Sequence, residues 1–233
     1  MSTLLLVRHG LTALTGPVLT GRTPGVHLDE RGKKQAAAVA ARIAAVPLSA
    51  IVTSPLERCV DTAEFIQSAQ QAAAALELQH DERIIECGYG EWTGRPLKEL
   101  VRDPVWKLVQ TQPSAARFPG GESLSEVSAR AVHAVRDWDA LLGDDAVWVA
   151  CSHGDVIKAI LADALGLHLD QFQRIVVDPC SVSVIRYSET RPYVLRSNDV
   201  GGDLAGFAPQ RKKGRRRRAS EATVGGGTGS GNV

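Results

Sequence analysis

Three polar segments of the sequence each follow directly on a short apolar run. The segments are Arg8-His9-Gly10, Ser54-Pro55-Leu56-Glu57-Arg58 and Ser152-His153-Gly154. Turns that follow parallel strands lie at the same edge of a sheet, and this edge is where open α/β sheets bind ligands. We therefore expect two arginines and two histidines from distant parts of the chain to converge on one pocket.

Such a pocket suits a phosphate group. Guanidinium groups present rigid pairs of donors that match phosphate oxygens, and helix N-termini after Ser54 and Gly154 would add backbone N–H groups. A histidine among these cations is held neutral by like charge, so its nitrogen lone pair stays available to attack phosphorus. The same cations offset the charge of the transferring group. We therefore expect phosphoryl transfer without a metal ion or another cofactor.

The motifs resemble those of a known family. Leu6-Val7-Arg8-His9-Gly10, Ser54–Cys59 and Ser152-His153-Gly154 are similar to the three phosphate-pocket motifs of the histidine phosphatase superfamily, the phosphoglycerate-mutase-like proteins. A fourth segment, Glu86–Gly94, resembles the family segment that has an acid four residues before a glycine. The four motifs occur in order, and the resemblance covers residues 3–200.

The resemblance implies a role for each matching side chain. His9 would form a phosphohistidine, while Arg8, Arg58 and His153 would hold the phosphoryl group. Glu86 would protonate the leaving oxygen and later activate water, since one group can serve as acid and then as base. The expected substrate-binding positions are Arg8, Gly10, Thr15, Thr20, Gly21, Arg58 and Gly154.

Some positions near these motifs leave alternatives open. Leu11 stands where the family often has a polar residue, and Thr15 stands where it usually has an asparagine. Thr15 can still donate a hydrogen bond through its hydroxyl. Other acids lie close to Glu86 in the sequence, namely Asp81, Glu82 and Glu91. Trp92 and Phe118 could either wall the pocket or pack in the core.

Strand and helix patterns alternate up to about residue 180, which predicts an α/β fold. We expect a three-layer αβα sandwich with a mostly parallel central sheet, as in phosphoglycerate-mutase-like proteins. The expected strands are residues 3–7, 50–53, 146–151, 181–187 and 193–198. The expected helices are one capped by Asp29, one from Ser54-Pro55 to about Ala75, one at 124–142 with a Ser123/Glu126 capping box, and one at 155–165.

Composition places the chain among ordinary globular proteins. Of its 233 residues 44% are hydrophobic, and the net charge is +1. No apolar run reaches the ~20 residues that cross a bilayer, and the N-terminus lacks the features of a secretory signal, so we expect a cytoplasmic protein without a membrane partner. The four cysteines form no CxxC pair, which argues against a zinc site. We interpret Cys59 and Cys151 as small buried hydrophobes, and the histidines outside the motifs as structural or surface residues: His27, His80, His133 and His168.

Two parts of the chain differ in composition. We expect one catalytic domain at residues 1–200 and a disordered tail at 201–233, where seven Lys or Arg side chains outnumber two acids. The basic run 211–218 could attract nucleic acid or anionic lipid. The interpretation we favour is a solvated tail without a specific partner. The sequence does not decide whether the protein forms a homo-oligomer.

Three functions compete at this stage. The first is a phosphomonoesterase that hydrolyses small phosphorylated metabolites. The segment Gly90–Gly94, which follows Glu86, resembles the corresponding segment in the phosphatase branch of the family. The second is a phosphomutase in which the same phosphohistidine returns its phosphate to the product. Segments 118–122 and 153–158 resemble an actinobacterial group of probable phosphomutases and acid phosphatases, so the resemblance does not decide between the two. The third is a non-catalytic binder of phospholigands or nucleic acid. The sequence does not identify the substrate, and we expect its specificity to reside in residues 91–122.

Overall fold

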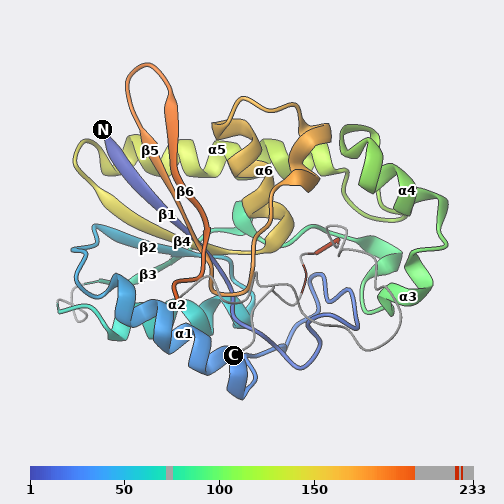
Figure 1. Ribbon diagram of the computed structural model, residues 1–233, viewed down its shortest axis with the longest axis horizontal. Helices are drawn as coiled ribbons and strands as arrows, with labels where there is room; N and C mark the ends of the chain where they lie inside the picture. Colours follow the sequence, from blue (N-terminus) through green and yellow to red (C-terminus); the bar gives the residue numbers. More distant parts are fainter. Residues whose placement is uncertain (72–75, 203–223, 226, 228–233) are drawn as a thin grey trace.

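The computed structural model describes residues 1–71, 76–202, 224–225 and 227, and its centre is a six-stranded sheet (Figure 1). The strands are β1 (Ser2–Arg8), β2 (Ala50–Thr53), β3 (Leu78–His80), β4 (Val147–Ser152), β5 (Val182–Tyr187) and β6 (Pro192–Asp199). They lie in the order β3-β2-β4-β1-β5-β6. Strands β1 to β4 are parallel, β5 runs antiparallel to β1, and β6 runs antiparallel to β5.

Helices cover both faces of this sheet. Helices α1 (Glu30–Ile43) and α2 (Glu57–Ser68) pack on one face, and α5 (Leu124–Leu142) and α6 (Gly154–Ala164) on the other (Figure 1). Successive strand residues point to opposite faces, so both faces must be apolar when both are covered. This requirement explains the uninterrupted apolar runs of the strands. The observed layers and strand directions confirm the expected three-layer sandwich with a mostly parallel sheet (Figure 1).

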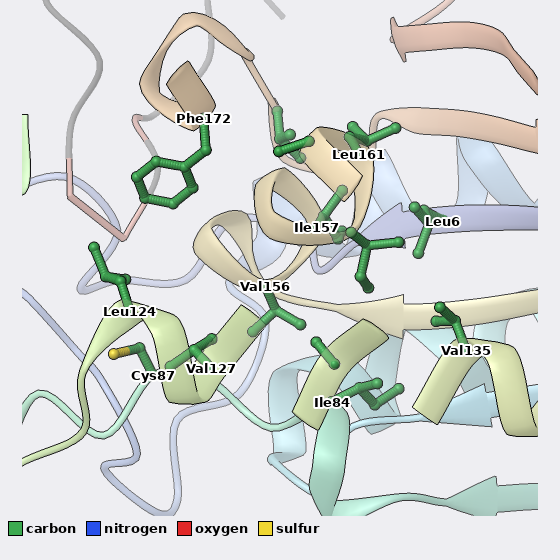
Figure 2. Packing of buried hydrophobic residues seen from close by; sticks show 14 of the residues in the cluster. Leu6, Ile84, Cys87, Leu124, Val127, Val135, Val156, Ile157, Leu161 and Phe172 are labelled. Carbon is green, nitrogen blue, oxygen red and sulfur yellow. The ribbon is translucent and has the colours of Figure 1, made fainter. Parts of the chain in front are cut away.

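The core on the α5 and α6 side is the larger of the two described apolar clusters. Figure 2 shows Leu6 of β1, Ile157 of α6 and Val127 of α5 within it. Phe172 from the 3-10 helix η5 (Leu169–Arg174) joins the same cluster. The packing fixes α6 against the sheet, and the first turn of α6 follows the segment that carries His153.

Local capping signals in the sequence are confirmed. The Asp29 side chain accepts a hydrogen bond from the Gly32 backbone N–H at the start of α1. Ser123 and Glu126 form a capping box at the start of α5, which spans the predicted residues. These caps involve neighbours in the chain, so they are visible in the sequence.

The predicted start of α2 was wrong. The helix begins at Glu57, two residues after Pro55, because Leu56 has an extended backbone. The Ser54 hydroxyl accepts from the Leu56 N–H at 3.4 Å and lies 2.7 Å from His153 Nε2, so it links the turn before α2 to the pocket. The predicted end was also wrong in part, since α2 ends at Ser68; residues 72–75 lie outside the described residues.

The segment 91–122 forms short helical pieces between the acid motif and α5. They are η3 (Gly90–Trp92), α3 (Leu97–Leu100), α4 (Pro104–Thr111) and η4 (Pro113–Ala115). A further 3-10 turn, η2 (Glu82–Ile84), leads from β3 toward the acid motif. Strand β3 was not predicted from the sequence, because its three residues are mostly exposed and leave no apolar pattern.

The predicted disordered tail lies mostly outside the described residues, and so does the basic run 211–218. Val224, Gly225 and Gly227 are described, and they lie against the body of the protein. Within the described ranges, every helix is too short or too polar to traverse a lipid bilayer.

Candidate active site

His9 stands at the carboxyl end of β1, where the chain leaves the sheet. Its Nδ1 lies 2.8 Å from the Gly10 carbonyl oxygen, which can only accept, so Nδ1 carries the proton. Its Nε2 then accepts from Arg58 Nε–H at 3.3 Å. Burial first, and then the charges of Arg58 and Arg8, hold the pKa of His9 well below its ordinary value. The imidazole is therefore neutral, and the lone pair of Nε2 faces the Arg58 guanidinium.

Arg58, the second residue of α2, connects the motifs that the sheet brings together. Its Nη2–H group donates to the Gly21 carbonyl at 2.7 Å and lies 3.2 Å from His153 Nδ1. Arg8 donates through Nη1 to the Val177 carbonyl at 2.8 Å. Both guanidiniums are almost fully buried.

Each guanidinium also keeps one buried nitrogen without a hydrogen-bond partner among the described residues. These nitrogens are Arg8 Nε and Arg58 Nη1. Buried, charged donors are costly to leave unpaired, and an oxyanion between the two arginines would satisfy them. The arrangement is chemically suited to a phosphoryl group.

His153 lies beside His9 at the end of β4, and the two ring centroids are 5.2 Å apart. Its Nδ1 accepts from Arg58, so its Nε2 donates to the Ser54 hydroxyl at 2.7 Å. Burial, followed by the charge of Arg58, lowers the pKa of His153 well below the usual histidine value. Both imidazoles of the site are thus neutral at physiological pH.

Glu86 provides a carboxyl group on another side of the site. Its Oε1 accepts from the Cys87 backbone N–H at 2.9 Å, and its Oε2 lies 3.8 Å from His153 Nδ1. Burial is the main cause that raises the pKa of Glu86 to about 7, and the nearby Asp155 carboxylate is the next. A carboxyl group with this pKa exchanges protons near neutral pH, as a general acid and base must.

Several of the residues named so far border one pocket that opens to solvent. Arg8, His9, Arg58 and Glu86 line it. The acids that the sequence left as alternatives to Glu86 lie elsewhere: Asp81 pairs with Arg83, and Glu82 and Glu91 are exposed. The structure thus brings together the five predicted catalytic side chains, with His153 just behind the lining.

The predicted substrate-binding positions divide into two groups. Thr15, Thr20 and Gly21 line the pocket, and the Thr15 hydroxyl accepts from the Thr12 N–H at 3.0 Å. Gly10 and Gly154 do not line it. A Cβ on Gly10 would lie 2.8 Å from the Gly32 carbonyl oxygen, so this glycine permits close packing of the chain against α1.

Sequence reasoning missed several residues of the site. Tyr89 lines the pocket and donates its hydroxyl to Asp155 at 2.8 Å, and Thr12 adds a second hydroxyl. Asp155 also lies 3.5 Å from the buried Lys158 ammonium, one turn further along α6. The sequence did contain a signal for Asp155, because an aspartate in the first turn of the helix that follows His153 must lie near the site.

Other aromatic and cysteine side chains near the motifs belong to the core. Trp92 and Phe118 are fully buried and pack edge-to-face against each other, which favours the packing alternative for both. Burial raises the pKa of the Cys59 thiol to about 12 and that of Cys151 well above its usual value. No cluster of three metal-ligating side chains occurs in residues 1–71, 76–202, 224–225 and 227.

Comparison with known proteins agrees with this geometry. The model of the histidine phosphatase superfamily (branch 1) matches residues 4–200. Phosphoserine phosphatase 1 of Hydrogenobacter thermophilus is 33% identical over 85% of this chain and 92% of its own. A probable phosphoglycerate mutase of Yersinia pestis is 30% identical over 79% of this chain and 85% of its own.

A solved structure shows the same architecture. The mycobacterial glucosyl-3-phosphoglycerate phosphatase superposes with a TM-score of 0.75 at 25% identity, over 84% of this chain and 98% of that one. The fold, the four motifs and the match across residues 4–200 lead to one conclusion: the chain belongs to the histidine phosphatase superfamily.

Proposed function

We propose that this protein hydrolyses monoesters of small phosphorylated metabolites through a phosphohistidine at His9. The observation that carries the proposal is the neutral His9 imidazole, whose Nε2 faces the Arg58 guanidinium in a pocket where Arg8 and Arg58 each keep a buried nitrogen without a partner among the described residues. Relatives and structural neighbours named as phosphatases of phosphoserine and of glucosyl-3-phosphoglycerate support a small phosphorylated substrate.

The first half-reaction forms the phosphoenzyme. His9 Nε2 attacks phosphorus and forms a P–N bond as the ester P–O bond breaks. The leaving oxygen takes the proton of Glu86 and departs as an alcohol. Arg8 and Arg58 balance the charge on the phosphoryl oxygens throughout, because their donors are already oriented and buried.

The second half-reaction returns the enzyme to its starting state. The Glu86 carboxylate takes a proton from water, and the resulting hydroxide attacks phosphorus as the P–N bond breaks. Inorganic phosphate leaves, and His9 and Glu86 regain their original protonation. A pKa of about 7 for Glu86 suits both steps, since the group must give a proton and then take one.

The proposal predicts phosphate release that does not depend on a metal ion. We expect hydrolysis of an aryl phosphate to be unchanged within about twofold after dialysis against EDTA, because the two guanidiniums supply the charge that a metal would otherwise supply. The measurement is the initial rate of phosphate release before and after dialysis. A magnesium-dependent phosphatase treated in parallel serves as the control. A loss of activity that added Mg²⁺ restores would contradict this part of the proposal.

The relative named a probable phosphoglycerate mutase favours one second candidate. In a mutase, the phosphohistidine returns its phosphoryl group to another hydroxyl of the substrate instead of to water. Incubation with 3-phosphoglycerate separates the two functions: hydrolysis gives inorganic phosphate, and mutase activity gives 2-phosphoglycerate. The phosphatase proposal predicts that phosphate release from the preferred substrate exceeds isomerisation at least about tenfold, a ratio that corresponds to ~1.4 kcal/mol in barrier height.

A further inference from the structure

The described residues near the C-terminus lie in the pocket itself. Val224 is buried to 1% exposure in the larger core cluster, and both Val224 and Gly225 line the pocket. In Figure 1 they belong to the short red segment, far in sequence from the strand ends that form the site. The sequence offered no sign of this contact, because the tail carries no apolar periodicity.

Backbone groups of this segment bind two side chains of the site. Arg8 Nη1 donates to the Gly227 carbonyl at 2.8 Å, and Arg8 Nη2 lies 3.4 Å from the Gly225 carbonyl. The Gly225 N–H donates to Asp155 Oδ2 at 3.0 Å. The segment therefore uses both terminal nitrogens of an arginine that the proposed mechanism assigns to the phosphoryl group.

Gly225 is the residue that permits this approach. Its backbone has φ +75°, and a Cβ there would lie 2.9 Å from Leu19 Cδ1 and 3.5 Å from the Tyr89 hydroxyl. An L side chain would be strained by the backbone angle and would also collide with Leu19. The contact between the segment and the pocket thus depends on glycine at this position.

The two possible partners of Arg8, the carbonyl groups of the segment and a phosphate group, differ in charge. A carbonyl oxygen is neutral, whereas a phosphate group is charged and can accept two parallel hydrogen bonds from one guanidinium. The segment, however, belongs to the same chain and needs no diffusion to reach Arg8, which gives it a high effective concentration. A phosphate ester in solution must compete with it.

We propose that the segment with Val224, Gly225 and Gly227 is an intramolecular competitor that occupies Arg8 and must be displaced by the phosphate group of the substrate. This inference rests on the proposed function, since it concerns regulation of the same site. The apparent affinity for phosphate equals the intrinsic affinity multiplied by the fraction of molecules in which the segment is released. Release of the segment should thus strengthen substrate binding without altering the groups that react.

The test uses two full-length variants with matched controls. Gly225→Ala introduces the collision with Leu19, and Gly202→Ala is its control because Gly202 also has a positive φ, +79°, but open space around it. Val224→Ser weakens the apolar contact in the core without adding a charge to the pocket, and Val200→Ser is its control because Val200 is 53% exposed. Catalytic side chains are unchanged in all four.

We expect both segment variants to lower the KM for an aryl phosphate and the dissociation constant of inorganic phosphate, with kcat within about twofold of the parent. The decrease is about tenfold if the segment occupies Arg8 nine-tenths of the time. The controls should show neither change. An unchanged or raised KM in the segment variants would overturn the proposal. A raised KM would mean that the segment contributes to substrate binding.

Calorimetric titration with inorganic phosphate separates this inference from the proposed function. It measures competition at Arg8 whether or not the protein turns over a substrate. Tighter phosphate binding in the segment variants would support the inference even if no hydrolysis were found. Equal binding in an active enzyme would refute the competitor and leave the proposed function intact.

Discussion

Replacement of His9 by alanine is expected to lower phosphate release from an aryl phosphate by at least about 10³-fold, since it removes the proposed nucleophile. His9 Nε2 faces the Arg58 guanidinium in the pocket that Arg8 also lines. We expect His153 not to substitute for it, because His153 does not line the pocket and its Nε2 is engaged by Ser54. The measurement is kcat/KM for the purified variant and its parent.

The control for this variant is His133→Ala. His133 is exposed on α5, so its removal should leave the rate within about twofold. Inorganic phosphate should still bind to the His9→Ala variant, because Arg8 and Arg58 remain in place. Activity within about tenfold of the parent would show that His9 is not the nucleophile.

Replacement of Glu86 by glutamine is expected to lower kcat by about 10²–10⁴-fold, the usual contribution of a general acid or base. The carboxyl group must be protonated to assist the leaving oxygen, and its pKa of about 7 places that proton in the physiological range. In the parent enzyme, kcat/KM should therefore fall as the pH rises through about 7. This decline should disappear in the variant, because glutamine does not titrate.

Two neighbouring acids provide matched controls for this experiment. Glu82→Gln and Glu91→Gln change exposed carboxylates close in sequence, so both variants should keep the parental rate and pH profile. The proposal would be contradicted if the alkaline decline persisted in Glu86→Gln or vanished in a control variant. In either case another group would be the acid.

The same carboxyl group should also affect folding stability. Its pKa in the folded protein is raised to about 7 from 4.5, so the folded state binds more protons between these values. The free energy of unfolding should then decrease as the pH rises from about 4.5 to about 7, by an amount on the order of 3 kcal/mol for this group alone. Glu86→Gln should flatten that part of the stability profile.

Much of the site could be predicted because its framework depends on simple patterns. Apolar runs that end in Arg8-His9, Ser54 and Ser152-His153 identify parallel strands covered on both faces, and parallel strands end at one edge. The convergence of these side chains follows from that geometry. Local caps such as Asp29 were equally visible, since each involves residues three positions apart.

The parts that could not be predicted depend on contacts between distant residues. Ser54 was expected to cap a helix from Pro55, but α2 begins at Glu57, and the Ser54 hydroxyl also contacts His153, ninety-nine positions later in the chain. Asp155 receives the Tyr89 hydroxyl, and no local pattern shows which element faces the start of α6. The same applies to Gly225 and Gly227, whose carbonyl groups reach Arg8 from the opposite end of the sequence.

The central claim is that His9 carries the phosphoryl group during turnover. The most direct test mixes the protein rapidly with an aryl phosphate, quenches at alkaline pH to preserve phosphohistidine, and locates the modification by peptide mass spectrometry. We expect a phosphoryl group on His9 in the parent, and none in the His9→Ala variant. Rapid release of the aryl alcohol with no phosphorylated peptide, or with phosphate on a residue other than His9, would contradict the account.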